Sequence, residues 1–429
     1  MSFFNSIKLP IVDNKQIMCP VWTRYTLHRK GEFCMTIKNT THERIEEGKR
    51  SIHWTEMHMP LLGELKSQFA KELPFAGLTI GICIHVEPKT AVLCRTLQAG
   101  GANVVLTGSP GTTKDPVAAA LQEEGITVYG QRADRRNEHL QNIHSVLRHQ
   151  PHLLMDNGAD LARTFIQQYD TNSLIGGTEE TTTGANLLRE ETGENIPFPI
   201  IVINDSPLKR IMENEHGVGQ TIIEGFMRTT NLILPTRRFV IVGYGTCGRG
   251  IARYLRNLGS QVVVVETDPI AGLEAALDGF RVARLEDTFA FAQVYITVTG
   301  RPNAILKEHF NQMNDGTILA NAGHFSWEMD LESLRQEAEH TDQLTTDIEQ
   351  FTLANGRRLM LLTQGEMLNL AGGSGNPAET MDLGLSLQAA SLLYLVQQRQ
   401  HLTLGPQPVP HSVNNTIAGQ MLKHLSYKI

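Results

Sequence analysis

The chain has 429 residues, which is too long for one ordinary hydrophobic core and therefore predicts two domains. With 41% hydrophobic residues, 19% charged residues and a formal net charge of -7, the composition indicates a globular protein and argues against a nucleic-acid partner. The five cysteines form no CxxC pair, so we expect no metal site. No secretory leader is recognisable, and no apolar run approaches the roughly 20 residues of a membrane span. We therefore expect a cytoplasmic protein without a membrane partner.

Short β-type runs alternate with helical segments from about residue 77 onward. The runs of this first series are LTIGI (78–82), NVVL (103–106), ITVY (126–129), HLLM (152–155) and IIVI (200–203). Such alternation predicts a parallel sheet with helices on both faces. We expect this first sheet to end near Ser206.

A second series of β-type runs begins near Arg238. Its members are FVIVG (239–243), QVVVVE (261–266), VYITVTG (294–300) and TILANAG (317–323). The segment 207–233 between the two series is expected to form a connecting helix. Apolar residues at helical spacing predict one long helix over residues 378–400, and a closing helix should follow PQPVP.

A dinucleotide-binding pattern follows the first strand of the second series. The GxGxxG residues are Gly243, Gly245, Thr246, Cys247 and Gly248. The glycines let the backbone and a helix N-terminus approach a pyrophosphate, and Glu266 at the end of the next strand can bind both ribose hydroxyls. Because this acid disfavours a 2′-phosphate, the pattern predicts NAD rather than NADP.

Polar side chains follow several of the predicted strands. Asp156 follows HLLM, His85 follows LTIGI, and His324 follows TILANAG. Lys209 and Glu213 are four residues apart and share one face of a helix, although a surface ion pair explains that spacing equally well. Because ligands of open α/β sheets bind at the carboxyl ends of strands, these residues together indicate a catalytic site.

The segment TEETTTG (178–184) combines two carboxylates with hydroxyl groups and a glycine. Such residues are poor material for a core and suit the binding of a sugar or of a nicotinamide ribose. A solvated polar loop is the alternative interpretation.

The sequence resembles the S-adenosyl-L-homocysteine hydrolase family over almost the whole chain. The shared signatures, in order, are EGKRSIHWTEMHMPLL, GICIH, TTKDPVAAAL, MDNGADL, EETTTG, INDSPLK, VGYGTCGRG, ETDPI, TVTG, NAGHF and LNL. The resemblance implies an α/β fold of two doubly wound parallel-sheet domains: residues 1–210 and 379–429 bind the substrate, and residues 211–378 form a Rossmann domain that binds NAD. It also implies an NAD-dependent enzyme that oxidises the ribose of a nucleoside at C3′, eliminates the 5′-thioether group and adds water, and that works as a homodimer or homotetramer.

The resemblance also implies a role for each matching residue. Lys209 would take the proton of the 3′-hydroxyl, Asp156 would act at C4′, and His85 and His324 would serve the group at C5′. The residues that would hold the ribose hydroxyls are Glu180, Thr181 and Glu213. The NAD positions outside the glycine-rich pattern would be Thr182, Thr183, Asn214, Glu266, Thr299 and Asn369.

The sequence departs from the family where the base is bound. Glu87 and Lys89 stand where the family has a threonine and a glutamate that face the base, Asn376 replaces a histidine, and Ser374 replaces a methionine. Lys89 could donate to a carbonyl such as the 6-oxo group of hypoxanthine, whereas an acid at this position suits the amino group of adenine. Alternatively, Glu87 and Lys89 turn outward to solvent and backbone groups hold adenine.

Three function classes follow from these observations. The first is hydrolysis of a 5′-thioether nucleoside, with adenine or another base. The second is a lyase or dehydratase that eliminates a different 5′-group after the same 3′-oxidation, and the third is a non-enzymatic regulator that senses NAD. Four acid–base residues argue against the regulator, because a sensor needs only the nucleotide site: Asp156, Lys209, Glu213 and His324.

Overall fold

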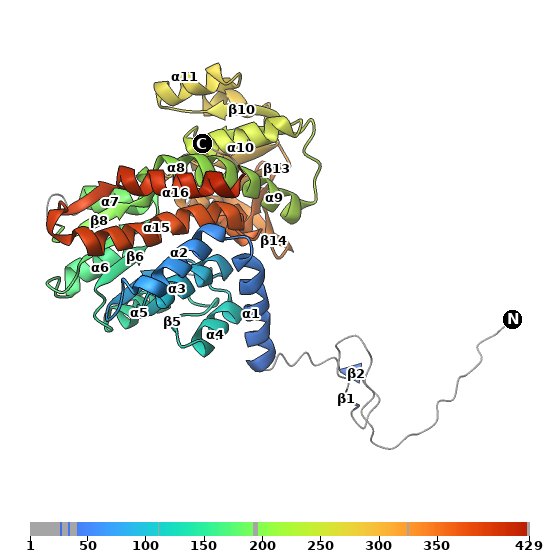
Figure 1. The fold of residues 1–429 in the computed structure, drawn as a ribbon. Coiled ribbons are helices and arrows are strands. Elements are labelled where there is room, and N and C mark those ends of the chain that lie inside the picture. The colour runs from blue at the N-terminus through green and yellow to red at the C-terminus, as the bar shows by residue number, and fades with distance from the viewer. Residues whose placement is uncertain are drawn as a thin grey trace.

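The computed structural model describes residues 26–27, 33–34, 41–109, 111–191, 196–323 and 326–426. Two large α/β sheets account for most of these residues (Figure 1). A short antiparallel pair, β1 (Thr26–Leu27) and β2 (Phe33–Cys34), precedes them. No helix of the described part is both long and apolar enough to cross a lipid bilayer.

The first sheet has seven strands, all parallel, in the order β17-β8-β7-β6-β3-β4-β5. Its strands are β3 (Thr79–Cys83), β4 (Asn103–Thr107), β5 (Thr127–Tyr129), β6 (Leu153–Asp156), β7 (Gly176–Glu179), β8 (Pro199–Val202) and β17 (Gly405–Pro408). The strand order reverses between β3 and β6. Ligands of doubly wound sheets bind at such a reversal, at the carboxyl ends of the strands.

Helices cover both faces of the first sheet. They are α1 (Thr41–Glu56), α2 (Pro60–Glu72), α3 (Pro88–Ala99), α4 (Asp115–Glu123), α5 (Arg136–Leu147), α6 (Asp160–Gln168), α7 (Thr182–Glu191), α15 (Ala378–Gln398) and α16 (His411–His424). Alternate strand residues enter two separate cores, one under α5 and α6 and one under α1 to α4, α15 and α16. Burial on both faces explains why the strands are continuous apolar runs.

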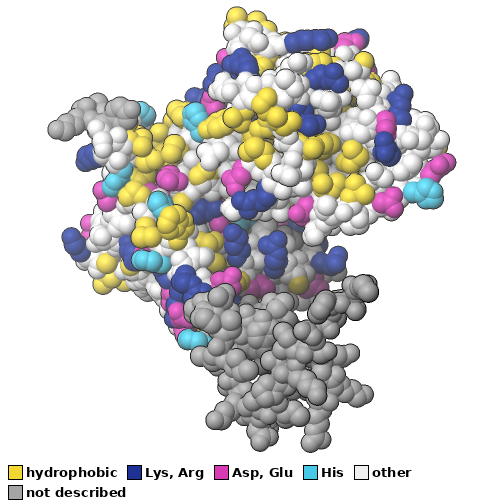
Figure 2. Space-filling model, turned by 90° about the vertical axis from the view of Figure 1, so that its right-hand side faces the viewer, with side chains coloured by type: hydrophobic (Ala, Val, Ile, Leu, Met, Phe, Trp, Pro, Cys, Tyr) yellow, Lys and Arg dark blue, Asp and Glu magenta, His cyan; other side chains and the backbone are white. Residues whose placement is uncertain are grey.

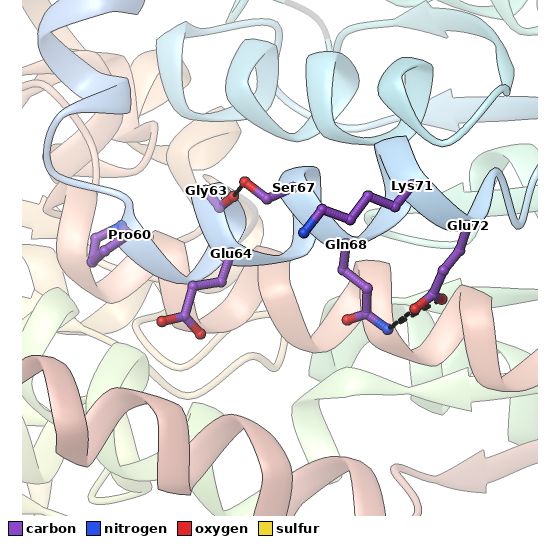
Figure 3. A pocket seen from close by; sticks show the side chains of 7 residues that line it. All are labelled: Pro60, Gly63, Glu64, Ser67, Gln68, Lys71 and Glu72. Carbon is purple, nitrogen blue, oxygen red and sulfur yellow. Dashed lines mark hydrogen bonds between the residues drawn. The ribbon is translucent and has the colours of Figure 1, made fainter.

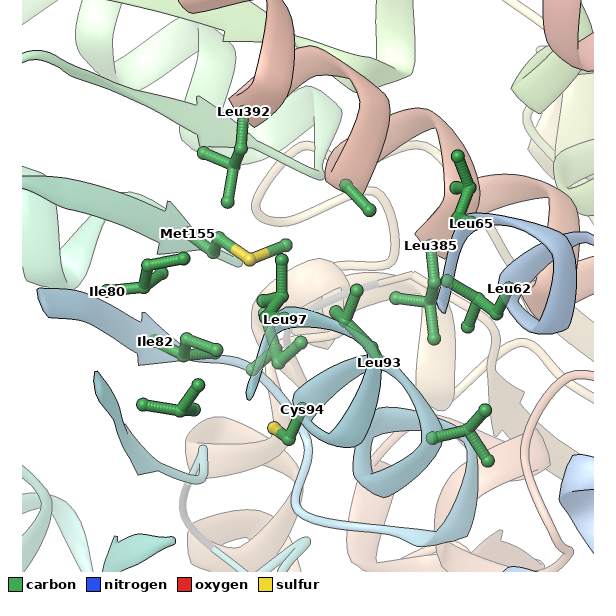
Figure 4. Close-up of a cluster of buried hydrophobic side chains, with 14 of the residues drawn as sticks. Leu62, Leu65, Ile80, Ile82, Leu93, Cys94, Leu97, Met155, Leu385 and Leu392 are labelled. Atoms are coloured by element: carbon green, nitrogen blue, oxygen red, sulfur yellow. The ribbon is translucent and has the colours of Figure 1, made fainter. Parts of the chain in front are cut away.

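The core under α15 joins segments from both ends of the chain. In Figure 4, Leu385 and Leu392 of α15 lie in the same buried cluster as Ile80 and Ile82 of β3 and Met155 of β6. The C-terminal helices are therefore part of the first sheet's core.

The second sheet has eight strands in the order β11-β10-β9-β12-β13-β16-β15-β14. They are β9 (Arg238–Val242), β10 (Gln261–Val265), β11 (Arg281–Ala283), β12 (Val294–Thr297), β13 (Thr317–Asn321), β14 (Ala338–Thr345), β15 (Ile348–Leu353) and β16 (Arg358–Leu362). The helices here are α10 (Thr246–Asn257), α11 (Pro269–Leu277), α12 (Lys307–Phe310), α13 (Leu331–Glu337) and α14 (Leu368–Ala371). The parallel strands follow the order 3-2-1-4-5-6 of the Rossmann fold, and β3 to β8 of the first sheet follow the same order.

The predicted connecting helix between the sheets is present, but it is not a regular α-helix. It consists of α8 (Pro207–Lys209), the eight-residue π-helix η3 (Arg210–Gly217) and α9 (Val218–Thr230). The Ser206 hydroxyl caps α8 by accepting a hydrogen bond from the backbone N–H of Leu208. Short π-helical stretches are rare and frequently occur at functional sites.

The predicted fold of two doubly wound α/β sheets is confirmed, but one prediction about the extent of the first sheet was wrong. The first sheet does not end near Ser206, because β17 pairs with β8 at the edge. Its prolines, Pro406 and Pro408, lack a backbone donor and are tolerated on an edge strand. The second sheet is not wholly parallel, because β14 and β15 add an antiparallel extension. The predicted long helix and closing helix are confirmed as α15 and α16.

Candidate active site

The carboxyl ends of β3, β6 and β7 bring together most of the polar residues predicted in the first sheet. Asp156 is the last residue of β6, and its backbone carbonyl accepts a hydrogen bond from the N–H of Glu180, which follows β7. His85 follows β3 and is half-buried. Because parallel strands all end at one edge, these residues share one side of the sheet at the strand-order reversal.

A buried lysine lies between two buried carboxylates. The Nζ of Lys209 lies 2.7 Å from Oε1 of Glu213 and 3.5 Å from Oε1 of Glu180. All three residues are at most 6% exposed. Asn157 donates from Nδ2 to the other Glu180 oxygen at 2.8 Å. The interpretation of Lys209 and Glu213 as a surface ion pair is therefore wrong, and so is the interpretation of 178–184 as a solvated loop, since Glu180 is buried.

The charges of this group determine where its protons reside. Burial alone would lower the pKa of Lys209, but the neighbouring carboxylates of Glu213 and Glu180 outweigh it and raise that pKa. Burial tends to raise the pKa of both acids. The ammonium of Lys209 reverses this for Glu180, whose pKa is lowered, whereas the pKa of Glu213 stays raised. Glu213 is therefore the acid of the pair better able to hold a proton next to Lys209.

Asp156 is 1% exposed and its two oxygens accept backbone hydrogen bonds. Oδ1 accepts from Asn157 at 3.0 Å and Oδ2 from Ala162, in the first turn of α6, at 2.8 Å. Burial and the charge of Glu179 raise the pKa of Asp156 well above its usual range. A carboxylate with a raised pKa is a stronger base than an ordinary aspartate.

The predicted base-binding residues form a second group, around the buried Lys89. Nζ of Lys89 lies 2.9 Å from Oε2 of Glu87 and donates to the carbonyl oxygens of Ser374 (3.1 Å) and Asn376 (2.8 Å). Lys89 is 6% exposed. The alternative in which Glu87 and Lys89 turn outward to solvent is therefore wrong. Instead, Lys89 joins α3 of the first sheet to the loop that leads from α14 into α15.

Asn376 connects this group to Glu213 and thus to Lys209. Its Nδ2 donates to Oε1 of Glu213 at 3.3 Å, and its Oδ1 accepts from Thr221 and Asn369, each at 3.3 Å. A continuous chain of polar contacts thus runs from Lys89 through Asn376 to Glu213 and Lys209.

The glycine-rich loop after β9 has the geometry that a pyrophosphate needs. A Cβ atom on Gly248 would lie 2.1 Å from the carbonyl oxygen of Gly243, which itself has a φ of 106°. A Cβ on Gly245 would meet nothing within 4 Å, so the backbone there faces open space. Thr246 and Cys247 begin α10, and burial raises the pKa of the Cys247 thiol to about 12, which keeps it neutral.

Glu266 lies beside this loop at the end of β10. Its carboxylate accepts hydrogen bonds from the backbone N–H groups of Tyr244 (2.7 Å), Thr267 (2.7 Å) and Asp268 (2.9 Å). The acid is thus already oriented at the position where a dinucleotide ribose binds in this fold.

The remaining predicted NAD positions lie on four different segments. Thr299 follows β12 and donates to Glu328 from its backbone N–H (2.7 Å) and its hydroxyl (3.0 Å). Oδ1 of Asn369 is buried and has no hydrogen-bond partner among the described residues, so it can accept one from a ligand. Asn214 donates to Asn204 at 3.1 Å. The first-turn residues of α7 are Thr182 and Thr183. Together with the open loop, these groups fit NAD.

His324 lies outside the described residues, so its expected place at C5′ stays a prediction. The hydroxyl of Thr181 is already engaged, because it donates to Glu179 and accepts from the N–H of Gly184. Sequence reasoning passed over Glu179 and Glu328, which are both fully buried. Glu179 could have been found from the sequence, because it stands next to Glu180 in the same pair of acidic residues.

A shallow hollow elsewhere on the molecule does not compete with this site. It runs along the outer face of α2, and its polar side chains all come from that one helix (Figure 3). Gln68 and Glu72 hydrogen-bond to one another there at 3.2 Å. No group of acidic, histidine or cysteine side chains among the described residues has the arrangement of a metal site.

Comparison with known proteins gives matches over both sheets. Residues 36–175 match the family model described as S-adenosyl-L-homocysteine hydrolase, and residues 214–375 match the model of its NAD binding domain. A Methanopyrus kandleri protein named S-inosyl-L-homocysteine hydrolase is 43% identical over 388 residues, which are 89% of this chain and 92% of that protein. A Sulfurisphaera tokodaii protein named adenosylhomocysteinase is 42% identical over 387 residues, which are 90% of this chain and 93% of that protein.

Replacing Glu266 with alanine should weaken NAD binding by about 1–3 kcal/mol, because a charge-assisted hydrogen bond to the ribose is lost. Calorimetric titration of NAD into cofactor-stripped protein measures the effect. Glu274→Ala, which removes an exposed carboxylate from the next helix, is the matched control and should bind NAD normally. An unchanged NAD affinity in Glu266→Ala would refute the assignment of this acid.

Proposed function

Since the chain belongs to the S-adenosyl-L-homocysteine hydrolase family, we propose that it hydrolyses S-inosyl-L-homocysteine, the substrate of this class with a 6-oxopurine base. The chain is an NAD-dependent hydrolase of the family's kind. Relatives named for the inosyl and for the adenosyl substrate are almost equally similar, so identity does not separate the two bases.

The position of Lys89 carries the proposal. By resemblance, it stands where the family has the glutamate that faces the 6-substituent of adenine. An ammonium has only hydrogen-bond donors, so it opposes an amino group and favours a 6-oxo oxygen. Its three N–H groups are directed at Glu87, Ser374 and Asn376 in the structure, so the 6-oxo oxygen would replace one of these three acceptors. Glu87, 2.9 Å from Lys89, adds an acceptor that suits the N1–H of hypoxanthine. Sites that hydrogen-bond their ligand reject analogues with mismatched groups strongly, because buried polar atoms are left unpaired.

We propose that Lys209 first gives its own proton to Glu213 and then receives the proton of the 3′-hydroxyl. The raised pKa of Lys209 keeps it protonated at rest, so it must release a proton before it can accept one. Glu213, at 2.7 Å and with a raised pKa, is placed to take that proton. NAD, when bound, supplies the acceptor for the hydride of C3′.

Asp156 is proposed to remove the proton at C4′. Oxidation at C3′ makes this hydrogen acidic, so a carboxylate with a raised pKa is strong enough as a base. Glu180, held by Asn157 at 2.8 Å, would accept a hydrogen bond from a ribose hydroxyl. His85 and His324 are proposed to serve the departing thiol and the arriving water at C5′.

The domain assignment stays part of the proposal: residues 1–210 and 379–429 bind the nucleoside, and residues 211–378 bind NAD. The family match of residues 214–375 to an NAD binding domain supports the second part.

We also propose a cytoplasmic location, which the buried free thiols of Cys83 and Cys94 support.

We further propose that the chain works as a homodimer or homotetramer. Helix α11 exposes Ile270, Leu273 and Leu277, which are 72%, 61% and 80% accessible and share one face of the helix. Hydrophobic side chains are visible in Figure 2 at the top of the molecule, where Figure 1 places α11. Further groups of hydrophobic side chains lie over the middle of this face, where acidic and basic side chains are interspersed. An exposed apolar stripe of this kind suits a second copy of the chain.

The two catalytic assignments can be separated by substitution. Lys209→Ala should abolish formation of NADH on addition of nucleoside, because the 3′-hydroxyl proton has no acceptor as hydride leaves. Asp156→Asn should still form NADH but should slow exchange of the C4′ hydrogen with solvent at least about 100-fold. NADH absorbance and NMR detection of deuterium at C4′ measure the two steps. Lys66→Ala, which removes a partly exposed ion pair, is the control. Normal turnover in both site variants would contradict these roles.

The base assignment predicts that kcat/KM for S-inosyl-L-homocysteine exceeds that for S-adenosyl-L-homocysteine at least about 100-fold. The double variant Glu87→Thr/Lys89→Glu should reverse the preference. Release of homocysteine, followed with a thiol reagent, measures both reactions. A kcat/KM of about 10⁴ M⁻¹s⁻¹ or more for the adenosyl substrate, equal to that for the inosyl substrate, would show instead that this loop reads adenine.

The double variant Leu273→Glu/Leu277→Glu should lower the oligomeric state, because charged side chains cannot be buried unpaired in the contact. Light scattering after size-exclusion chromatography measures the mass. Leu404→Glu, at an isolated position that is 65% exposed, is the control and should keep the parent's mass. If the parent is a monomer, or if the double variant keeps the parent's mass, α11 is not the contact.

A further inference from the structure

We infer that Glu179, the last residue of β7, is a positioning residue for the C4′ step, because it joins the loop behind Asp156 to the segment that carries Glu180 and Thr181. The inference rests on the proposed role of Asp156. Glu179 is fully buried, and both of its oxygens accept hydrogen bonds from the loops after β6 and β7.

The carboxylate of Glu179 accepts four hydrogen bonds from two loops. Oε1 accepts from the backbone N–H of Gly158 (3.0 Å) and from the N–H and hydroxyl of Thr181 (2.7 Å each). Oε2 accepts from the N–H of Ala159 at 3.0 Å. Glu179 is 0% exposed and is the register partner of Asp156 on the neighbouring strand. One side chain therefore fixes the loops after both β6 and β7.

The loop after β6 needs this support. Gly158 and Ala159 have φ angles of 100° and 63°, and the left-handed conformation is unfavourable for an alanine. This turn points two consecutive N–H groups at Glu179. Ala159 is also the N-cap residue of α6, but its methyl side chain cannot accept a hydrogen bond. Asp156 caps the helix instead, because its Oδ2 accepts a hydrogen bond from the backbone N–H of Ala162. Displacing Glu179 would thus release the turn that orients Asp156.

The carboxylate is also enclosed from a third side. A Cβ on Gly184 of α7 would lie 2.4 Å from Oε1 and Cδ of Glu179. The backbone of α7 therefore packs directly on the carboxylate. A glutamine has the same shape and still fits in this space.

Glu179 acts on Asp156 through its charge as well as through its shape. Burial raises the pKa of Asp156, and the neighbouring charge of Glu179 raises it further. The other titratable groups around Asp156 are Cys83 of β3, Asp160 of α6 with its partners Arg136 and His139, and Glu180 with its partner Lys209. Removing the charge at Glu179 while these groups stay in place should lower the pKa of Asp156.

The test compares two variants of the NAD-loaded enzyme. Glu179→Gln keeps the shape and removes the charge, and its NH2 group can no longer accept the hydrogen bond that Oε2 takes from Ala159. Gly184→Ala keeps the charge and displaces the carboxylate. We expect Glu179→Gln to slow C4′ hydrogen exchange about 10-fold or more and to move the midpoint of its pH profile down by about one unit. Gly184→Ala should slow exchange without moving the midpoint. NADH formation on addition of nucleoside should persist in both.

The outcomes are distinct. An unshifted pH midpoint in Glu179→Gln, with or without a loss of thermal stability, would overturn the inference, because a merely structural residue changes stability alone. If Glu179→Gln fails to fold, the double variant Glu179→Gln/Ala159→Gly takes its place, since glycine adopts the left-handed turn without strain. Asp156→Asn is measured in parallel. Normal exchange in that variant would refute the role of Asp156 itself, which is a different failure from an unshifted midpoint in Glu179→Gln.

Discussion

The arrangement of the strand ends depends on one buried ammonium. Lys209 neutralises Glu180, which follows β7, and Glu213, which lies in the connecting helix. Breaking such a buried pair leaves an uncompensated charge, at a cost of about 3–5 kcal/mol. The start of the connecting helix must therefore stay over the end of β7. Because the same helix leads into the second sheet, the ion pair also helps to set where the second sheet begins relative to the site.

Much of the fold could be predicted from periodicity, and the exceptions have physical reasons. The nine predicted strands are apolar because both faces of each sheet are covered. Strand β7 was missed because its sequence, GGTE, has two glycines and ends in an acid. Burial of the Lys209 and Glu213 pair could not be predicted, because a four-residue spacing fits a surface helix equally well. In the pair of Glu179 and Glu180, neighbouring residues of an extended chain point in opposite directions, and sequence alone does not say which one faces the loops.

In both sheets, a buried carboxylate accepts hydrogen bonds from the N–H groups of a loop that follows a strand. Loops that follow parallel strands carry backbone N–H groups without ladder partners. In the first sheet, Glu179 accepts from the loop after β6. In the second, Glu328 accepts from the N–H groups of Thr299 and Gly300 after β12, each at 2.7 Å. Each buried carboxylate thus holds a loop at the reversal of strand order, where the fold binds its ligands, and each keeps that loop in place before any ligand arrives.

The return of the C-terminal segment to the first sheet affects how the chain folds during synthesis. Leu385 and Leu392 of α15 complete the core of a sheet whose first six strands end at Val202. On the ribosome, the strands of the second sheet emerge before α15 does, so they can pair while one face of the first sheet is covered only by α1 to α4. At about 5–20 residues per second, that face waits roughly ten seconds or more for its cover. During this interval the apolar side chains that α15 later covers stay exposed on the nascent first half, and exposed apolar surface promotes aggregation.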